Sequence, residues 1–97
     1  MLMLSIFQYD PEKRDQVVRK RLELGPPQRP GVKLIGQWSY VGGGKVFTLI
    51  ETENQKAAYE LMMPYSNLGT FEVFPLLETE AVLEMLKRQP VAVPAGM

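Results

Sequence analysis

The chain of 97 residues contains no cysteine and no histidine. Without cysteine it can form no disulfide and no thiolate metal site. Without histidine it lacks the side chain that most often binds metals and most often acts as a general base near neutral pH. A Ser-His-Asp triad is therefore excluded, and we predict neither a metal site nor a bound cofactor.

The sequence also has no excess charge of either sign, because 11 basic residues balance 11 acidic ones. Nucleic-acid-binding proteins are normally basic overall or along one face, so nucleic acid is not an expected partner. A net charge near zero gives little repulsion between copies and is compatible with self-association. The largest basic cluster lies on the first predicted helix, where we interpret it as a solvated helix face: Lys13, Arg14, Arg19, Lys20 and Arg21.

Long hydrophobic runs are missing as well. The apolar opening from Met1 to Phe7 is short and has no basic region before it, unlike a signal peptide. No window approaches the roughly 20 apolar residues that a membrane-spanning helix requires. We therefore predict a cytoplasmic protein with no membrane partner.

The sequence predicts one domain over residues 1–88, followed by a C-terminal tail over residues 89–97 that is extended or partly ordered. Strands are expected at 2–9, 32–41, 45–51 and 70–77. Helices are expected from Asp10-Pro11-Glu12 to Gly25-Pro26-Pro27, from a Thr52–Gln55 capping box to about Met63, and from Thr79 onward. The last helix is predicted to turn Val82, Met85 and Leu86 inward.

Gly42-Gly43-Gly44 separates the second and third strands and predicts a tight hairpin. The element order is then βαββαβ, which favours an α+β ferredoxin-like fold. Such a fold has an antiparallel four-stranded sheet in the order 4-1-3-2, with both main helices on one face. Pro75 predicts that the fourth strand is an edge strand or contains a bulge.

The opposite face of such a sheet has no helix to cover it. We expect that face to pack on a second copy, because extended apolar patches usually mark interfaces. Strand alternation assigns one mixed set of residues to the uncovered face: Ser5, Phe7, Ile35, Gln37, Ser39, Val46, Thr48, Ile50, Glu72 and Phe74. The other set is Leu4, Ile6, Leu34, Trp38, Phe47, Leu49, Phe71 and Val73. A register slip of one residue would exchange the two sets.

Several segments resemble one protein family in their order and spacing. They are the strand Met3–Ile6, the hairpin with Trp38 before its glycine turn, the strand Phe47–Thr52, and the run Tyr65–Leu68 leading into Phe71–Leu76. Over about residues 1–80, the sequence resembles a small uncharacterised bacterial family of the dimeric α+β barrel (ferredoxin-like) superfamily. The resemblance implies the fold and a homodimer, and it implies no reaction.

The wider superfamily includes cofactor-independent monooxygenases, haem-degrading enzymes, haem peroxidases and lactone isomerases. Several of its haem proteins place a histidine on the iron. This chain has no histidine, so the resemblance does not extend to that chemistry.

Five side chains are candidates for a ligand site. Trp38 and Tyr40 combine aromatic surface with a polar group, as pocket walls often do. Glu51 and Glu72 lie among apolar residues, where burial could raise a carboxyl pKa for acid–base work. Tyr65 lies on a loop that could cover a pocket. The alternatives are a core tryptophan, solvated or ion-paired carboxylates, and a simple turn.

Three functions stay open at this stage, and the sequence does not decide whether the protein is an enzyme. The first is a homodimer that binds a small apolar or aromatic ligand in a pocket between the sheet and its partner. The second is a cofactor-independent oxygenase or isomerase, by analogy of fold. The third is a structural or protein-interaction module in which the basic first helix meets a partner.

Overall fold

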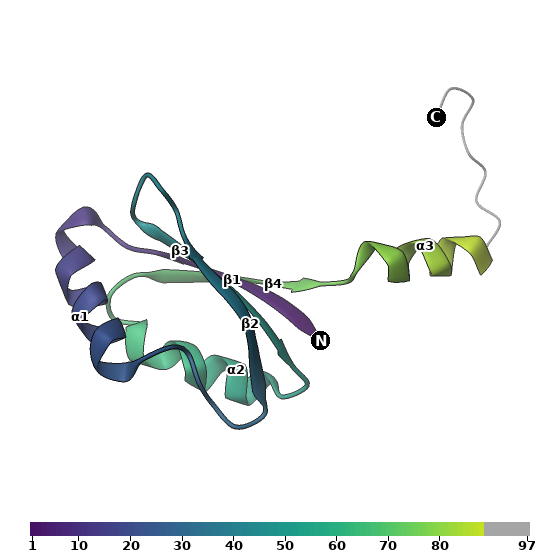
Figure 1. Ribbon diagram of the computed structural model, residues 1–97, viewed down its shortest axis with the longest axis horizontal. Helices are drawn as coiled ribbons and strands as arrows, with labels where there is room; N and C mark the ends of the chain where they lie inside the picture. The colour runs from purple at the N-terminus through teal and green to yellow at the C-terminus, as the bar shows by residue number, and fades with distance from the viewer. Residues whose placement is uncertain (89–97) are drawn as a thin grey trace.

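A computed structural model describes residues 1–88 (Figure 1). Its strands are β1 (Leu2–Gln8), β2 (Val32–Ser39), β3 (Lys45–Thr52) and β4 (Thr70–Leu76). Its helices are α1 (Arg14–Leu24), α2 (Gln55–Met62) and α3 (Thr79–Arg88), with 3₁₀ turns at Pro11–Lys13 and Met63–Tyr65. The predicted tail, 89–97, lies outside the described residues.

The four strands form one antiparallel sheet in the order β2-β3-β1-β4. This is the predicted 4-1-3-2 order read from the other edge, and it confirms the ferredoxin-like fold. Figure 1 shows α1 and α2 together on one side of the sheet. Because β4 is an edge strand, Pro75 can sit within it without breaking the hydrogen bonds of a central ladder.

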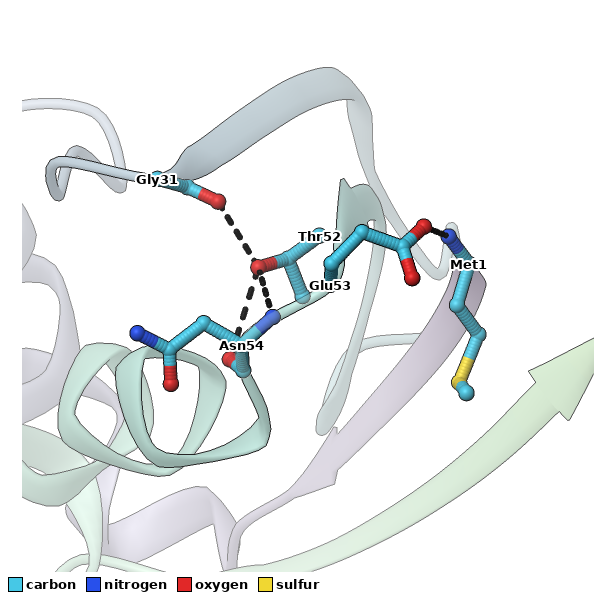
Figure 2. Close-up of polar contacts among 5 residues, drawn as sticks. All are labelled: Met1, Gly31, Thr52, Glu53 and Asn54. Atoms are coloured by element: carbon cyan, nitrogen blue, oxygen red, sulfur yellow. Dashed lines mark hydrogen bonds and ion pairs between the residues drawn. The ribbon is translucent and has the colours of Figure 1, made fainter.

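The start of α2 differs from the predicted capping box (Figure 2). Asn54, and not Thr52, is the cap, because its side-chain oxygen accepts a hydrogen bond of 3.1 Å from the Ala57 amide. The buried Thr52 hydroxyl instead donates to the Gly31 carbonyl at 2.7 Å and accepts from the Asn54 amide at 3.0 Å. Thr52 therefore joins the loop before β2 to the end of β3, and satisfies its own buried hydroxyl.

The hydrophobic core under the helices is divided into two clusters. One contains Met3, Ile50 and Ala58, packed against partly buried residues of β2 and α2. The other contains Phe7, Val17 and Leu68, with aromatic rings around Phe7. The two clusters lie toward opposite ends of the strands, and the middle of the sheet between them is not filled by apolar side chains.

Most side chains predicted for the uncovered face of the sheet lie on the covered face, and most of those predicted for the covered face lie on the open one. Most of the mixed set lies under the helices, where it faces residues of α1 and α2: Ser5, Phe7, Gln37, Ser39, Val46, Thr48 and Ile50. Strand pairing then places Leu4, Ile6, Phe47 and Leu49 on the open face, together with Trp38, Glu72 and Phe74. The uncovered face is therefore more apolar than predicted.

Two local features explain why the predicted alternation of side chains between the two faces is wrong on β2 and β4. A bulge between Leu34 and Gly36 adds a residue to β2, so Leu34 and Trp38 lie on opposite faces of the sheet. On β4, Val73 pairs with Ser5 and Glu72 pairs with Ile6, so the alternation runs opposite to the predicted sets. Neither shift follows from a single strand's own sequence, since both depend on the neighbouring strand.

Helix α3 does not pack inward as predicted. It begins three residues after β4 ends and points away from the sheet (Figure 1). Val82, Met85 and Leu86 are 36%, 59% and 49% exposed. The projecting helix helps give a radius of gyration of 17.3 Å, against about 12 Å for a compact domain of this length.

Candidate functional site

A cavity of about 740 Å³ lies between the covered face of the sheet and the helices α1 and α2. Small-molecule sites commonly enclose about 300–1,000 Å³, so this space is of the right size for such a ligand. It opens between the two core clusters. Its walls are mostly apolar, with Val18 and Leu22 from α1, Leu61 and Met62 from α2, and Phe71 from β4.

The floor of the cavity is a row of three polar side chains, which we call the polar row: Gln37 on β2, Thr48 on β3 and Ser5 on β1. They are neighbours because Gln37 pairs with Thr48, and Thr48 pairs with Ser5. The Gln37 amide donates to the Thr48 hydroxyl at 2.9 Å, and the Ser5 hydroxyl lies 3.7 Å from the Met62 sulfur. A dry core would place apolar residues here, since buried polar groups are costly without partners.

Arg21 on α1 extends the polar row to the cavity wall. Its Nε–H donates to the Gln37 side-chain oxygen at 3.2 Å. Within residues 1–88, no aspartate or glutamate lines the cavity. The other lining arginine, Arg29, is paired with Glu60, whereas no ion pair to Arg21 is found within residues 1–88. Arg21 thus presents a positive charge to a mostly apolar space.

Tyr65 closes the cavity beside the second core cluster. Its ring meets Phe7 edge-on at 5.9 Å between centroids. Burial raises the pKa of the Tyr65 hydroxyl above its ordinary value of 10, and the nearby Arg21 charge opposes this rise. The hydroxyl is consequently protonated at neutral pH and serves as a hydrogen-bond donor rather than as a base.

This electrostatic arrangement predicts an alkaline titration of Tyr65 that depends on Arg21. In a tyrosinate absorbance titration, Tyr65 should ionise in a phase above pH 10, and Tyr65→Phe should remove that phase. Arg21→Gln should move the phase higher still, because it removes the charge that favours tyrosinate. Well below pH 10, Tyr65 is protonated in both the folded and the unfolded state. As the pH rises through 10 the unfolded chain loses this proton first, so stability should fall until the folded state ionises as well.

A downward shift of that phase in Arg21→Gln would contradict the assigned electrostatics. Arg19→Gln is the matched control, because Arg19 is exposed on the same helix and does not line the cavity. It should leave the Tyr65 titration unchanged.

The structure brings one of the five predicted ligand residues, Tyr65, into the cavity. Trp38 is 56% exposed on the open face, where its ring lies over Gly36. Tyr40 is 55% exposed at the hairpin turn, with its ring over Gly42. These two aromatic side chains are therefore outside the cavity.

The two candidate carboxylates are also outside it. Glu51 is exposed near the end of β3, beside a shallow depression, and lies directly opposite Lys33 in the strand register. Glu72 is exposed on the open face of β4, opposite Ile6. Roles of Glu51 and Glu72 in binding a ligand, like those of Trp38 and Tyr40, stay predictions.

Within residues 1–88, no three acidic side chains come close enough together to hold a metal ion. The cavity itself offers hydroxyls, amides and two guanidinium groups, which do not form a metal-binding donor set. The helices in this part of the chain are also too short to cross a membrane.

The sequence matches a family described as "Domain of unknown function (DUF3303)" over residues 1–90. The chain belongs to this family. No curated protein matches it, whereas two chains of solved structures do. One of these is the crystal structure of a candidate antibiotic biosynthesis monooxygenase from Deinococcus radiodurans, with a TM-score of 0.50 and 10% identity over 80% of this chain and 93% of that one. At this identity the likeness confirms the fold alone, in agreement with the resemblance to the dimeric α+β barrel superfamily.

The polar row of this DUF3303 chain was missed in the sequence, although a signal for part of it exists. Tyr40 bonds Lys45 across the hairpin turn, and counting outward from this pair brings Gln37 opposite Thr48. Arg21 is four residues after the buried Val17, which places it on the inward stripe of α1. The interpretation of the basic cluster as a solvated helix face is wrong for Arg21, which lines the cavity although charge runs usually mark solvated faces. No comparable signal places Ser5 beside Thr48, since β1 and β3 are joined only by the tertiary fold.

Proposed function

We propose that this protein binds a small molecule with an apolar, planar body and an anionic oxygen at one end. The single observation that carries the proposal is Arg21, which meets the polar row in a cavity that no acidic side chain of residues 1–88 lines. The apolar walls would hold the body of the ligand, while Arg21 and the polar row would receive its oxygen. Charge-assisted hydrogen bonds are the strong ones, so the anion would set the orientation.

The site lies under the chain's own helices. The sequence predicts a pocket between the sheet and a partner, whereas the walls of this cavity come from a single chain. Its cause is visible in the packing. Val17 is the buried residue of α1, whereas Val18 is 48% exposed and Leu22 78% exposed while both line the cavity. A space therefore remains between α1 and the sheet above the polar row.

Two related fluorescent probes test the role of Arg21. Anilinonaphthalene sulfonate has an aromatic body and an anionic group, and phenylnaphthylamine is a closely similar body without the sulfonate. We expect Arg21→Gln to weaken sulfonate binding by about 10–100-fold, as expected for the loss of a charge-assisted bond. Binding of the neutral probe should be nearly unchanged in the same variant.

Arg19→Gln is again the matched control, since it removes the same charge from the exposed side of α1. It should change the affinity of neither probe. Equal sulfonate affinity in the wild type and Arg21→Gln, with the fold retained by circular dichroism, would show that the anion is not received by Arg21. If Arg21→Gln bound neither probe, its cavity would have collapsed. A Gln37→Leu variant would then test the contribution of the polar row to sulfonate binding while the Arg21 charge is kept.

A cofactor-independent oxygenase is the second candidate function. It is favoured by the fold shared with the candidate monooxygenase from Deinococcus radiodurans. It is also favoured by a site that no aspartate or glutamate of residues 1–88 lines, which suits an electron-rich anion. The cavity-lining residues of the described chain, 1–88, include no carboxylate, and Tyr65 holds its proton at neutral pH. The site would therefore act on a substrate that arrives ionised, such as an acidic phenol, and would not need to deprotonate it.

Oxygen consumption separates binding from oxygenation. An acidic dihydroxyaromatic compound should be consumed with dissolved oxygen if the protein is an oxygenase, and should be bound unchanged if it is not. Arg21→Gln should abolish the oxygen uptake. Glu51→Gln and Glu72→Gln should retain it, because both carboxylates lie outside the cavity.

We also propose that the open sheet face packs on a second copy. The observation in support is the apolar character of that face, with Trp38, Phe74 and Leu76 exposed by 56%, 41% and 40%. Extended apolar patches of this kind are rare on monomers. The balance of 11 basic and 11 acidic residues gives no net charge to keep copies apart.

A further inference from the structure

We infer that α3 is an arm that packs its apolar face on a second copy of the chain. The inference rests on the proposed dimer through the open sheet face and adds a second contact surface to it. It starts from the helix itself, which leaves the edge strand β4 and extends away from its own domain (Figure 1).

The residues of α3 separate cleanly into two faces. At 100° per residue, the apolar residues fall on one half of the helix: Ala81, Val82, Leu83, Met85 and Leu86. The charged residues fall on the other half: Glu80, Glu84, Lys87 and Arg88. Such a helix normally buries its apolar half against a core, yet none of its residues is buried.

A helix of this length needs a covering surface. An isolated helix shorter than about 12–15 residues is marginal in water, and α3 has 10 residues. One ion pair between Glu84 and Lys87 lies on its exposed polar side, and such pairs contribute little. Most of the stability of α3 must therefore come from packing, which the rest of residues 1–88 does not supply.

The apolar surface of α3 is continuous with the open sheet face. Phe74 and Leu76 on β4 belong to that face, and Leu77 follows directly, 61% exposed, before the helix begins. Exposed apolar residues thus follow one another along the chain from the sheet face through the connection to the arm. This continuity points to a single occupant for both parts, and a second copy carries the complementary apolar surface.

The areas agree with this assignment. If a fully exposed large apolar side chain presents about 200 Å², the open sheet face offers roughly 600 Å² and the arm with Leu77 roughly 500 Å². A stable interface needs about 800 Å² from each partner, so the sheet face alone falls short and the two together suffice. The arm also has two acidic and two basic residues, which gives it no charge preference for a different partner.

Sedimentation equilibrium of full-length variants tests the arm. Met85→Glu/Leu86→Glu places charges on its apolar face, and we expect the dimer dissociation constant to rise at least about tenfold. Glu84→Gln, on the polar face of the same helix, should leave the constant within about threefold of the wild type. Trp38→Glu should weaken the dimer through the sheet face.

Energy transfer in mixtures of labelled and unlabelled chains shows whether the arm contacts the second copy. The chain has a single tryptophan and no cysteine, so labels can be placed without background. Copies with Trp38→Phe and a dansyl group on Glu84→Cys are mixed with unmodified chains. Because the labelled copies hold no tryptophan, energy transfer from Trp38 can arise only between chains. It should exceed the transfer to a dansyl group on Arg19→Cys, which lies on the opposite side of the sheet.

The outcomes distinguish failure of the arm contact from failure of the sheet-face dimer. If Trp38→Glu dissociates the dimer but Met85→Glu/Leu86→Glu does not, the sheet-face dimer stands and the arm is refuted. If transfer to position 84 does not exceed transfer to position 19, the arm packs elsewhere and the inference fails. A wild-type chain that is monomeric at all concentrations would overturn both the dimer and the arm.

Discussion

Replacing Phe7 with alanine is expected to destabilise the protein by about 3–5 kcal/mol, the usual cost of truncating a buried phenylalanine. Phe7 is 5% exposed and lies in the cluster with Val17 and Leu68. Three further rings surround it, at centroid distances of 5.7 Å to Tyr9, 5.9 Å to Tyr65 and 4.6 Å to Phe71. The substitution removes both the buried area and these aromatic contacts.

The expected loss is comparable with the whole stability of a small domain, which is about 5–15 kcal/mol. Phe7→Ala should therefore show a much lower midpoint in urea unfolding, or should not fold. Phe7→Leu is the conservative control, because it keeps most of the volume and should cost clearly less. A Phe7→Ala protein within about 1 kcal/mol of wild type would mean that this cluster does not hold the sheet to α1.

Replacing Gly69 with alanine is expected to be nearly as damaging, for a different reason. A Cβ at this position would lie 2.2 Å from the Gln8 backbone carbonyl oxygen and 2.8 Å from the Phe7 ring. Neither can give way easily, because Gln8 is fixed in β1 by pairing with both β3 and β4 and Phe7 is buried. Forced overpacking of this kind usually costs about 1–3 kcal/mol, and backbone contact adds to it.

Gly36→Ala is the matched control for Gly69→Ala. Its Cβ would also meet a close obstacle, at 2.5 Å, but that obstacle is the outer edge of the Trp38 ring. Trp38 is 56% exposed and can move toward solvent, so the cost should be smaller. Thermal unfolding of both variants compares them directly, and an equal loss at the two positions would contradict the view that rigid backbone decides the cost.

The sequence by itself determined the order of the elements and the class of fold. The Gly42-Gly43-Gly44 turn defined the hairpin, the proline and glycine signals after Leu24 ended the first helix, and the element order then gave the sheet order that is observed. These features are local, because each depends on the conformations that a few neighbouring residues can adopt. The absence of cysteine and histidine likewise removed whole classes of site without any structure.

Only the tertiary structure decided which face of the sheet is covered and where the cavity lies. The bulge at Leu34–Gly36 and the pairing of β4 with β1 set the phase of two strands, and a shift of one residue moves every side chain to the other face. The meeting of Arg21 with Gln37 joins a helix to a strand 16 residues away, which no local pattern encodes. The exposed α3 is the opposite case: its amphipathic pattern is plain in the sequence, but the domain leaves that face without a partner, because packing depends on what the rest of the chain brings near it.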